Sequence, residues 1–195
     1  SPLVLEAVPG QTTDITTGEA VNSLFLTAPN GATNITPLTT MAQIKAEVEG
    51  VSYSDAQASV ATNLGLDAST DLTALDYVKE GNTKVATTAQ VIAKVISSNI
   101  ATISSSSSSN NTTANANTLA VYNLVSDSTA VETITTTVSA AVDSGDQTAI
   151  SSAVDTLASS TTISTDEVEN GLNTVNDSLN NGTGGTGTGG CYLVR

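Results

Sequence analysis

The sequence predicts a mainly helical α+β protein, in which a small N-terminal β element packs on a bundle of about seven helices. Two short runs rich in apolar and β-branched residues, at 2–8 and 21–27, indicate strands. From residue 36 onward, apolar residues recur at spacings of three and four, which is the period of a helix. Only 3% of the residues are aromatic, so the core must consist of small and branched aliphatic side chains.

The N-terminal β element is predicted over residues 1–35. The run 2–8 ends at a Pro-Gly pair, and the run 21–27 is followed by Ala-Pro-Asn-Gly, a composition typical of the turns that bound strands. An isolated pair of strands is only marginally stable in water. The two strands therefore need a third strand or a layer of helices beside them.

A helical module is predicted over residues 36–103. Its first helix has Thr36 as cap and Pro37 at the first helical position, and it ends at Gly50. A second helix follows a capping sequence that begins at Ser52. We expect a short third helix from Asp71 to Lys79. The strongest helical pattern comes next and predicts the central core helix, with inward positions at Val85, Ala89, Ile92, Ala93, Ile96, Ile100 and Ile103.

The second half of the chain begins with a Ser-rich and Asn-rich stretch, 104–117, which predicts a low-complexity linker. A C-terminal helical segment is predicted over 118–181, because four apolar stripes with short polar breaks fit antiparallel helices. The β-branched Thr residues near its start weaken helicity, so a strand over 131–138 is the alternative. Residues 182–195 are predicted to form a flexible Gly-rich tail with the single cysteine, Cys191.

Charge and surface composition restrict the partners. The formal net charge is -14, with five Lys and Arg residues against 19 Asp and Glu residues. Such a surface repels phosphate, so we expect no nucleic-acid partner. No apolar run is long enough to cross a bilayer, so we expect no direct membrane insertion. A polar surface of Ser, Thr and Asn predicts a secreted or cell-surface protein.

The chemistry expected of enzymes is missing from the sequence. There is no His, which removes the commonest general base and most transition-metal sites. Carboxylates such as Asp67 and Asp71 remain as a route to acid-base catalysis, but solvated charges at helix ends explain them better. We therefore predict that the chain is not an enzyme and has no cofactor. Calcium is the one ion left open, and its candidate ligands, for which solvated turn acids are the alternative, are Asp14, Glu19, Asp143 and Asp146.

Three segments, 28–40, 50–57 and 63–67, resemble a module of large bacterial surface lipoproteins and adhesins. The first contains Pro-Leu-Thr-Thr, the second Gly-Val-Ser-Tyr-Ser-Asp-Ala-Gln, and the third Leu-Gly-Leu. In that family the module follows an immunoglobulin-like or transthyretin-like sandwich, so the resemblance implies that residues 3–27 are the last strands of such a sandwich. The earlier strands are not in this sequence. The resemblance thus implies either a longer precursor or strands supplied by another subunit.

These observations predict an extracellular structural subunit that self-assembles into a filament, fibre or sheath, with strand donation between subunits as one route. The expected partners are copies of the chain itself. An unpaired thiol in a secreted protein also suggests a covalent link through the cysteine. The alternative is a monomeric adhesin or stalk module of a cell-surface lipoprotein. The residues predicted to serve assembly or attachment are Leu3, Val4, Leu5, Val8, Cys191, Tyr192, Leu193 and Val194.

Overall fold

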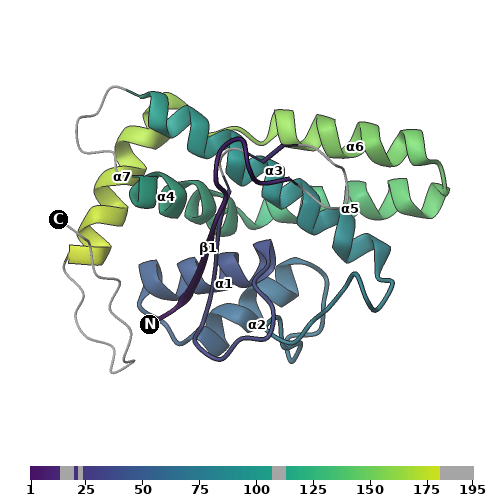
Figure 1. The fold of residues 1–195 in the computed structure, drawn as a ribbon, viewed down its shortest axis with the longest axis horizontal. Helices are drawn as coiled ribbons and strands as arrows, with labels where there is room; N and C mark the ends of the chain where they lie inside the picture. The colour runs from purple at the N-terminus through teal and green to yellow at the C-terminus, as the bar shows by residue number, and fades with distance from the viewer. Residues whose placement is uncertain (14–19, 22–23, 107–112, 181–195) are drawn as a thin grey trace.

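The computed structural model describes residues 1–13, 20–21, 24–106 and 113–180 (Figure 1). Within these ranges it confirms the mainly helical α+β class, with a two-stranded sheet at the N-terminus and seven helices. The elements are β1 (Leu3–Glu6), β2 (Phe25–Ala28), α1 (Pro37–Glu49), α2 (Tyr53–Asn63), α3 (Thr83–Ser105), α4 (Thr113–Ser126), α5 (Ser128–Ser144), α6 (Gln147–Ser160) and α7 (Thr165–Asn180).

The two strands pair antiparallel, with Leu3 opposite Ala28 and Glu6 opposite Phe25. β2 lies between β1 and α1, so the helices cover β2 far better than β1. Leu26 and Thr27 of β2 are accordingly buried, whereas most of β1 is exposed. The predicted need for a second layer is met by α1.

Local side-chain chemistry sets the start of the first helices. The Thr36 hydroxyl accepts a hydrogen bond from the Thr39 N–H at 3.1 Å, and the Thr39 hydroxyl accepts one from the Thr36 N–H at 2.9 Å. This reciprocal pair is a capping box, and it fixes the first turn of α1. Gly50 ends α1 in the left-handed region at φ 67°, where a residue without Cβ is favoured. The predicted ends of α1 are confirmed.

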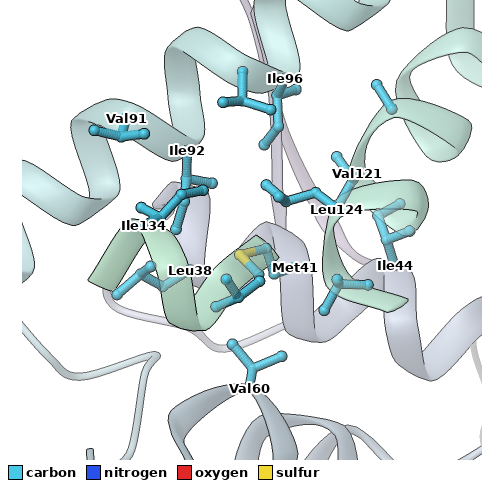
Figure 2. Close-up of a cluster of buried hydrophobic side chains, with 14 of the residues drawn as sticks. Leu38, Met41, Ile44, Val60, Val91, Ile92, Ile96, Val121, Leu124 and Ile134 are labelled. Atoms are coloured by element: carbon cyan, nitrogen blue, oxygen red, sulfur yellow. The ribbon is translucent and has the colours of Figure 1, made fainter. Parts of the chain in front are cut away.

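α3 forms the centre of the helical bundle, as predicted. It packs against α4, α5 and α6, and its Ile92 and Ile96 are fully buried. Figure 2 shows these side chains pointing into an interior that they share with Leu124 of α4 and Met41 of α1. The largest fully buried side chains of the described ranges are Leu38, Met41, Leu72, Ile92, Ile96, Ile103, Leu124, Ile134, Val60, Val91, Val95 and Val121. This confirms an aliphatic core.

The C-terminal half is helical, and α5 and α6 form an antiparallel pair (Figure 1). Gly145 ends α5 at φ 69°, and Asp146 caps α6 at once, which gives the short connection. Residues Val131, Ile134 and Val138 are buried at helical spacing on α5. The strand alternative for 131–138 is therefore wrong. Tertiary burial of this apolar stripe outweighs the low helix propensity of its Thr residues.

Two expectations differ from the structure. Residues 71–79, predicted to be a helix, form a series of turns. The Asp71 carboxylate accepts from the Thr73 N–H at 2.9 Å, and the Asp76 carboxylate accepts from the Lys79 N–H at 3.0 Å. Such local bonds compete with the helical ladder. In the range predicted as a linker, 104–117, α3 continues to residue 105 and α4 begins at residue 113. The predicted tail 182–195 lies outside the described residues.

Candidate functional site, an open sheet edge

The first turn of α1 closes the outer edge of β2 at Thr27. The Thr27 N–H donates a hydrogen bond to the Thr40 hydroxyl at 2.9 Å. The Thr27 carbonyl accepts one from the Thr39 hydroxyl at 3.0 Å. Both Thr side chains are fully buried on α1. Side chains of the helix thus take the place that a third strand would occupy beside β2.

This contact also fixes the direction of every backbone group in the sheet. In an antiparallel ladder the N–H and C=O of one residue point to the same side, and the side alternates along the strand. Since Thr27 faces α1, its two neighbours on β2 face β1. The Ala7 N–H donates to the Leu24 carbonyl at 2.8 Å, which continues the same alternation. The hydrogen-bonded pairs are therefore Leu3 with Ala28, Leu5 with Leu26, and Ala7 with Leu24.

No described element lies along the outer edge of β1. By the same alternation, Val4 and Glu6 direct their N–H and C=O groups away from β2. Among the residues that the structure describes, no hydrogen bond reaches these four groups. The segment from Val4 to Glu6 is therefore a short row of solvated donors and acceptors in strand geometry, ready to pair with another extended segment.

This open row is bounded at both ends. On one side, Pro2 has no backbone N–H and cannot donate. On the other side, the groups of Val8 are already used by a turn. Its N–H donates to the Thr12 hydroxyl at 2.7 Å, and its carbonyl accepts from the N–H groups of Gln11 and Thr12 at 3.0 Å. The edge therefore offers N–H donors at two residues only, Val4 and Glu6, with the carbonyls of these residues and of Pro2 as acceptors.

Exposed apolar side chains lie along the same edge. Val4, Leu5 and Val8 are 53%, 45% and 50% exposed, and Leu3 is half-buried. Val4, Leu5 and Val8 are three of the five large exposed apolar side chains of the described ranges. Neighbouring residues of a strand point to opposite faces, so the exposure of Val4 and Leu5 leaves both faces of β1 uncovered. A partner strand would cover apolar surface as well as pair the main chain.

The structure brings together four of the predicted assembly residues, all at β1 or just after it. The other four, Cys191, Tyr192, Leu193 and Val194, lie outside the described residues. Their role in attachment stays a prediction. The sequence indicated β1 through its apolar residues, but it gave no signal for the alternation that leaves Val4 and Glu6 unpaired, because that depends on a contact with α1.

A second surface feature, absent from the predictions, is a polar hollow of about 630 Å³ between the α4–α5 and α6–α7 junctions. Its two acids are Asp127 and Glu167. The Asp127 carboxylate accepts from the Ala130 N–H at 2.9 Å and caps α5. The Glu167 carboxylate accepts from the Ser164 N–H at 2.7 Å, and this bond lowers the pKa of Glu167. Both acids thus stabilise helix starts, which accounts for their positions.

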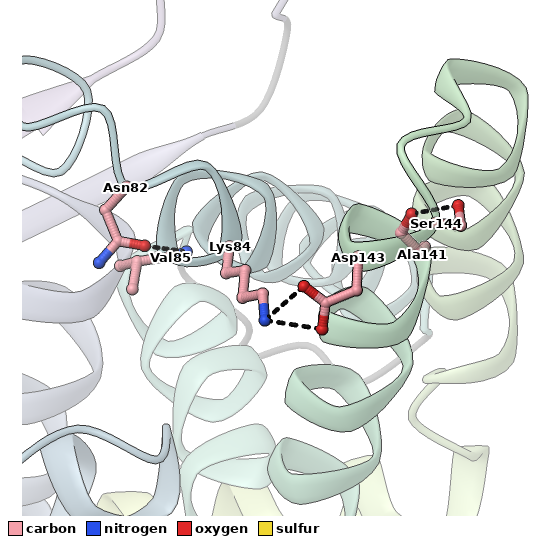
Figure 3. A network of polar contacts seen from close by, with 6 residues as sticks. All are labelled: Asn82, Lys84, Val85, Ala141, Asp143 and Ser144. Carbon is pink, nitrogen blue, oxygen red and sulfur yellow. Dashed lines mark hydrogen bonds and ion pairs between the residues drawn. The ribbon is translucent and has the colours of Figure 1, made fainter.

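Of the candidate calcium ligands, the structure describes Asp143 and Asp146. Asp143 forms an ion pair with Lys84 at 2.7 Å, which joins α5 to α3 (Figure 3). Asp146 accepts from the Thr148 N–H at 2.8 Å at the start of α6. Asp14 and Glu19 lie outside the described residues. Within the described ranges, no three His, Cys, Asp or Glu side chains form a group that could hold a metal ion. In the same ranges, no helix has the length and apolarity of a membrane span.

The Pro-Leu-Thr-Thr segment has a structural role here, since its Thr39 and Thr40 close the edge of β2. No family model matches the chain, and it has no match among curated proteins or solved structures. The resemblance to the surface lipoprotein module stays a prediction.

Proposed function

We propose that the chain is an extracellular structural subunit that assembles with copies of itself by adding a strand to the open edge of β1. The observation that supports this is the unpaired row at Val4 and Glu6. Natural sheets protect their edges with Lys, Pro, bulges or a covering element. In this sheet α1 covers β2, whereas β1 has Pro2 and Glu6 at the ends of its open row and, among the described residues, no covering element over Val4 and Leu5.

The charges of the molecule favour a contact of this kind. At a formal charge of -14, copies repel each other over long distances. Three lysines are already paired within the chain, Lys45 with Glu49, Lys84 with Asp143 and Lys94 with Asp155. Few cations are thus left to bridge two copies. Main-chain hydrogen bonds and apolar contacts do not depend on opposite charges, and β1 offers both.

The contact is small, and this sets the conditions for assembly. A hydrogen bond adds about 0.5–1.5 kcal/mol net, because it replaces bonds to water. Stable specific interfaces usually bury about 1,200–2,000 Å². A short edge strand buries less, so one contact would be weak. Assembly would therefore require a high subunit concentration or further contacts on the same subunit, as in a filament or sheath.

Replacing Val4 by Pro tests the proposal. The substitution removes the outward N–H and leaves the bonds of Leu3 and Leu5 to β2, and Pro is tolerated on an edge strand whose N–H faces solvent. We expect a folded protein that no longer assembles. Sedimentation velocity over a range of concentrations, with electron microscopy, measures the assembly. Circular dichroism checks the fold.

The matched control is Val4→Ala, which keeps the N–H and removes only apolar surface. Its assembly should be weakened but present. If the Val4→Pro variant assembles like the wild type, the proposal is wrong. A wild-type protein that stays monomeric at every concentration would also contradict it and would favour the alternative, a monomeric adhesin or stalk module.

A further inference from the structure

We infer that the strand added to β1 is β1 of a second copy, paired antiparallel about a two-fold axis at Leu5. This inference rests on the proposed function and names the partner segment. It follows from the alternation along β1, from the two positions that bound the open row, and from the charge of Glu6.

The open row is complementary to itself. In an antiparallel pair, hydrogen bonds form only where outward-facing residues of both strands lie opposite each other. Placing Val4 opposite Glu6 of the second copy meets this condition, and the two-fold axis repeats the pair. Every outward N–H and C=O of Val4 and Glu6 then has a partner. Leu5 lies opposite Leu5 of the second copy in a pair without hydrogen bonds, where side chains approach most closely.

The ends of the row fit the same register. Pro2 then lies opposite Val8 of the second copy. Pro2 has no N–H to donate, and the N–H and C=O of Val8 are held by the turn at Gln11 and Thr12. The Val8 N–H is already used by the turn, so the Pro2 carbonyl gains no partner from the second copy, and the ladder ends at this pair on each side.

Neighbouring registers fit less well. If Val4 lies opposite Val4, Glu6 faces Pro2, which lies outside β1 and has no N–H, so only Val4 pairs through strand residues of both copies. If Glu6 lies opposite Glu6, two carboxylates stand directly across from each other, which is unfavourable. A shift by one residue sets outward-facing groups against inward-facing ones and forms no ladder. The register centred on Leu5 avoids all three defects.

The product would be a four-stranded sheet in the order β2, β1, β1, β2. Its outer edges are the two β2 strands, and in each copy Thr39 and Thr40 of α1 close that edge. α1 thus occupies each outer edge at Thr27, and a two-fold contact of this kind ends at a dimer. A filament or sheath would need a second contact on each dimer. The sequence offers one candidate for this second contact, the segment from Cys191 to Val194 that is predicted above as an attachment site.

Single cysteines test the register. In a Cys191→Ser background, Leu5→Cys places two thiols across the axis, where Cα atoms of such a pair lie about 4.5 Å apart. This is within the range of a disulfide, about 4.4–6.8 Å. We expect Leu5→Cys to give a disulfide-linked dimer on mild oxidation. In Val4→Cys the thiols lie on a diagonal of about 7–8 Å and should not link. Val78→Cys, on an exposed turn, measures random collisions.

The mixture of Val4→Cys and Glu6→Cys should link, because these residues lie opposite each other in the inferred register. Linking of Val4→Cys alone, in excess of Leu5→Cys, would show the register centred on Val4 and overturn the inference. If no β1 cysteine links above the Val78→Cys level while Val4→Pro still blocks assembly, another segment fills the edge, and the inference fails but the proposed function stands. If Val4→Pro leaves assembly intact, both fail.

Discussion

Two Thr hydroxyls at the start of α1 decide which side of the small sheet stays open. Thr39 and Thr40 are fully buried, and each forms a hydrogen bond with the backbone of Thr27. An Ala or Val in their place could not donate or accept. Since residues on a strand alternate in direction, this one contact determines that Val4 and Glu6 face outward. The open edge thus follows from two side chains in another element.

Glu47 provides a prediction about stability and pH. Its carboxylate is partly buried on α1, and burial raises the pKa, although a hydrogen bond from the Gln43 amide at 2.7 Å opposes the shift. A raised pKa in the folded state means that the folded state binds the proton more tightly than the unfolded state. Stability is therefore lost as the pH rises through the raised pKa. We expect Glu47→Gln to increase the free energy of unfolding at pH 7, but to have little effect below about pH 4.

Urea denaturation at both pH values measures this difference. The matched control is Glu49→Gln on the same helix, which removes the i,i+4 ion pair with Lys45 and should change stability by at most about 1 kcal/mol, downward. The pKa values of Asp67, Asp71 and Glu167 are lowered by hydrogen bonds, so the stabilisation from these groups is lost only at still lower pH. A Glu47→Gln variant that is less stable at pH 7 would contradict this account.

Helix ends could be predicted from the sequence because their chemistry is local. Caps such as Thr36, Ser52 and Asn82 each accept the expected backbone hydrogen bond. The turns at 71–79 could not be predicted in this way, since helix caps and turn-forming Asp residues have the same composition. The carboxylates of Asp71 and Asp76 accept hydrogen bonds from nearby backbone N–H groups. These bonds stabilise turns in place of the helical hydrogen bonds.

The packing of α7 on α4 provides a prediction that opposes helix propensity. A Cβ atom at Gly171 would lie 2.3 Å from Cδ1 of Leu119, which is almost fully buried. Ala favours a helix over Gly by about 1 kcal/mol. Overpacking in a core costs about 1–3 kcal/mol. We expect Gly171→Ala to lower the free energy of unfolding by about 1 kcal/mol, as measured by urea denaturation.

Asn170→Ala is the control, because Asn170 is the exposed neighbour on the same helix and the change should be neutral or slightly stabilising. The cost of Gly171→Ala should also shrink when Leu119 is replaced by Ala, since the contact is then gone. A Gly171→Ala variant that is more stable than the wild type would show that propensity dominates and that α4 and α7 pack loosely.

The fold class and most helices could be predicted because the spacing of apolar residues and the cap and turn residues are local features of the sequence. The apolar stripe predicted on α3 is an example, since five of its seven positions are buried. Val85 and Ala93 are half-buried instead, and Val91 and Val95, outside the predicted stripe, are fully buried. The candidate site could be predicted only in part. Its apolar residues were visible as a strand pattern, but the pairing partner and the free edge depend on contacts between β2 and α1, which no local pattern encodes.

Backbone hydrogen exchange tests the central claim, that the outer edge of β1 pairs with another strand in the assembled protein. In dilute protein the amides of Val4 and Glu6 should exchange freely, whereas those of Leu5 and Ala7, which bond to β2, are protected. As concentration rises and the protein assembles, we predict that Val4 and Glu6 gain protection together. An assembled sample in which both amides still exchange at the unprotected rate would contradict the account.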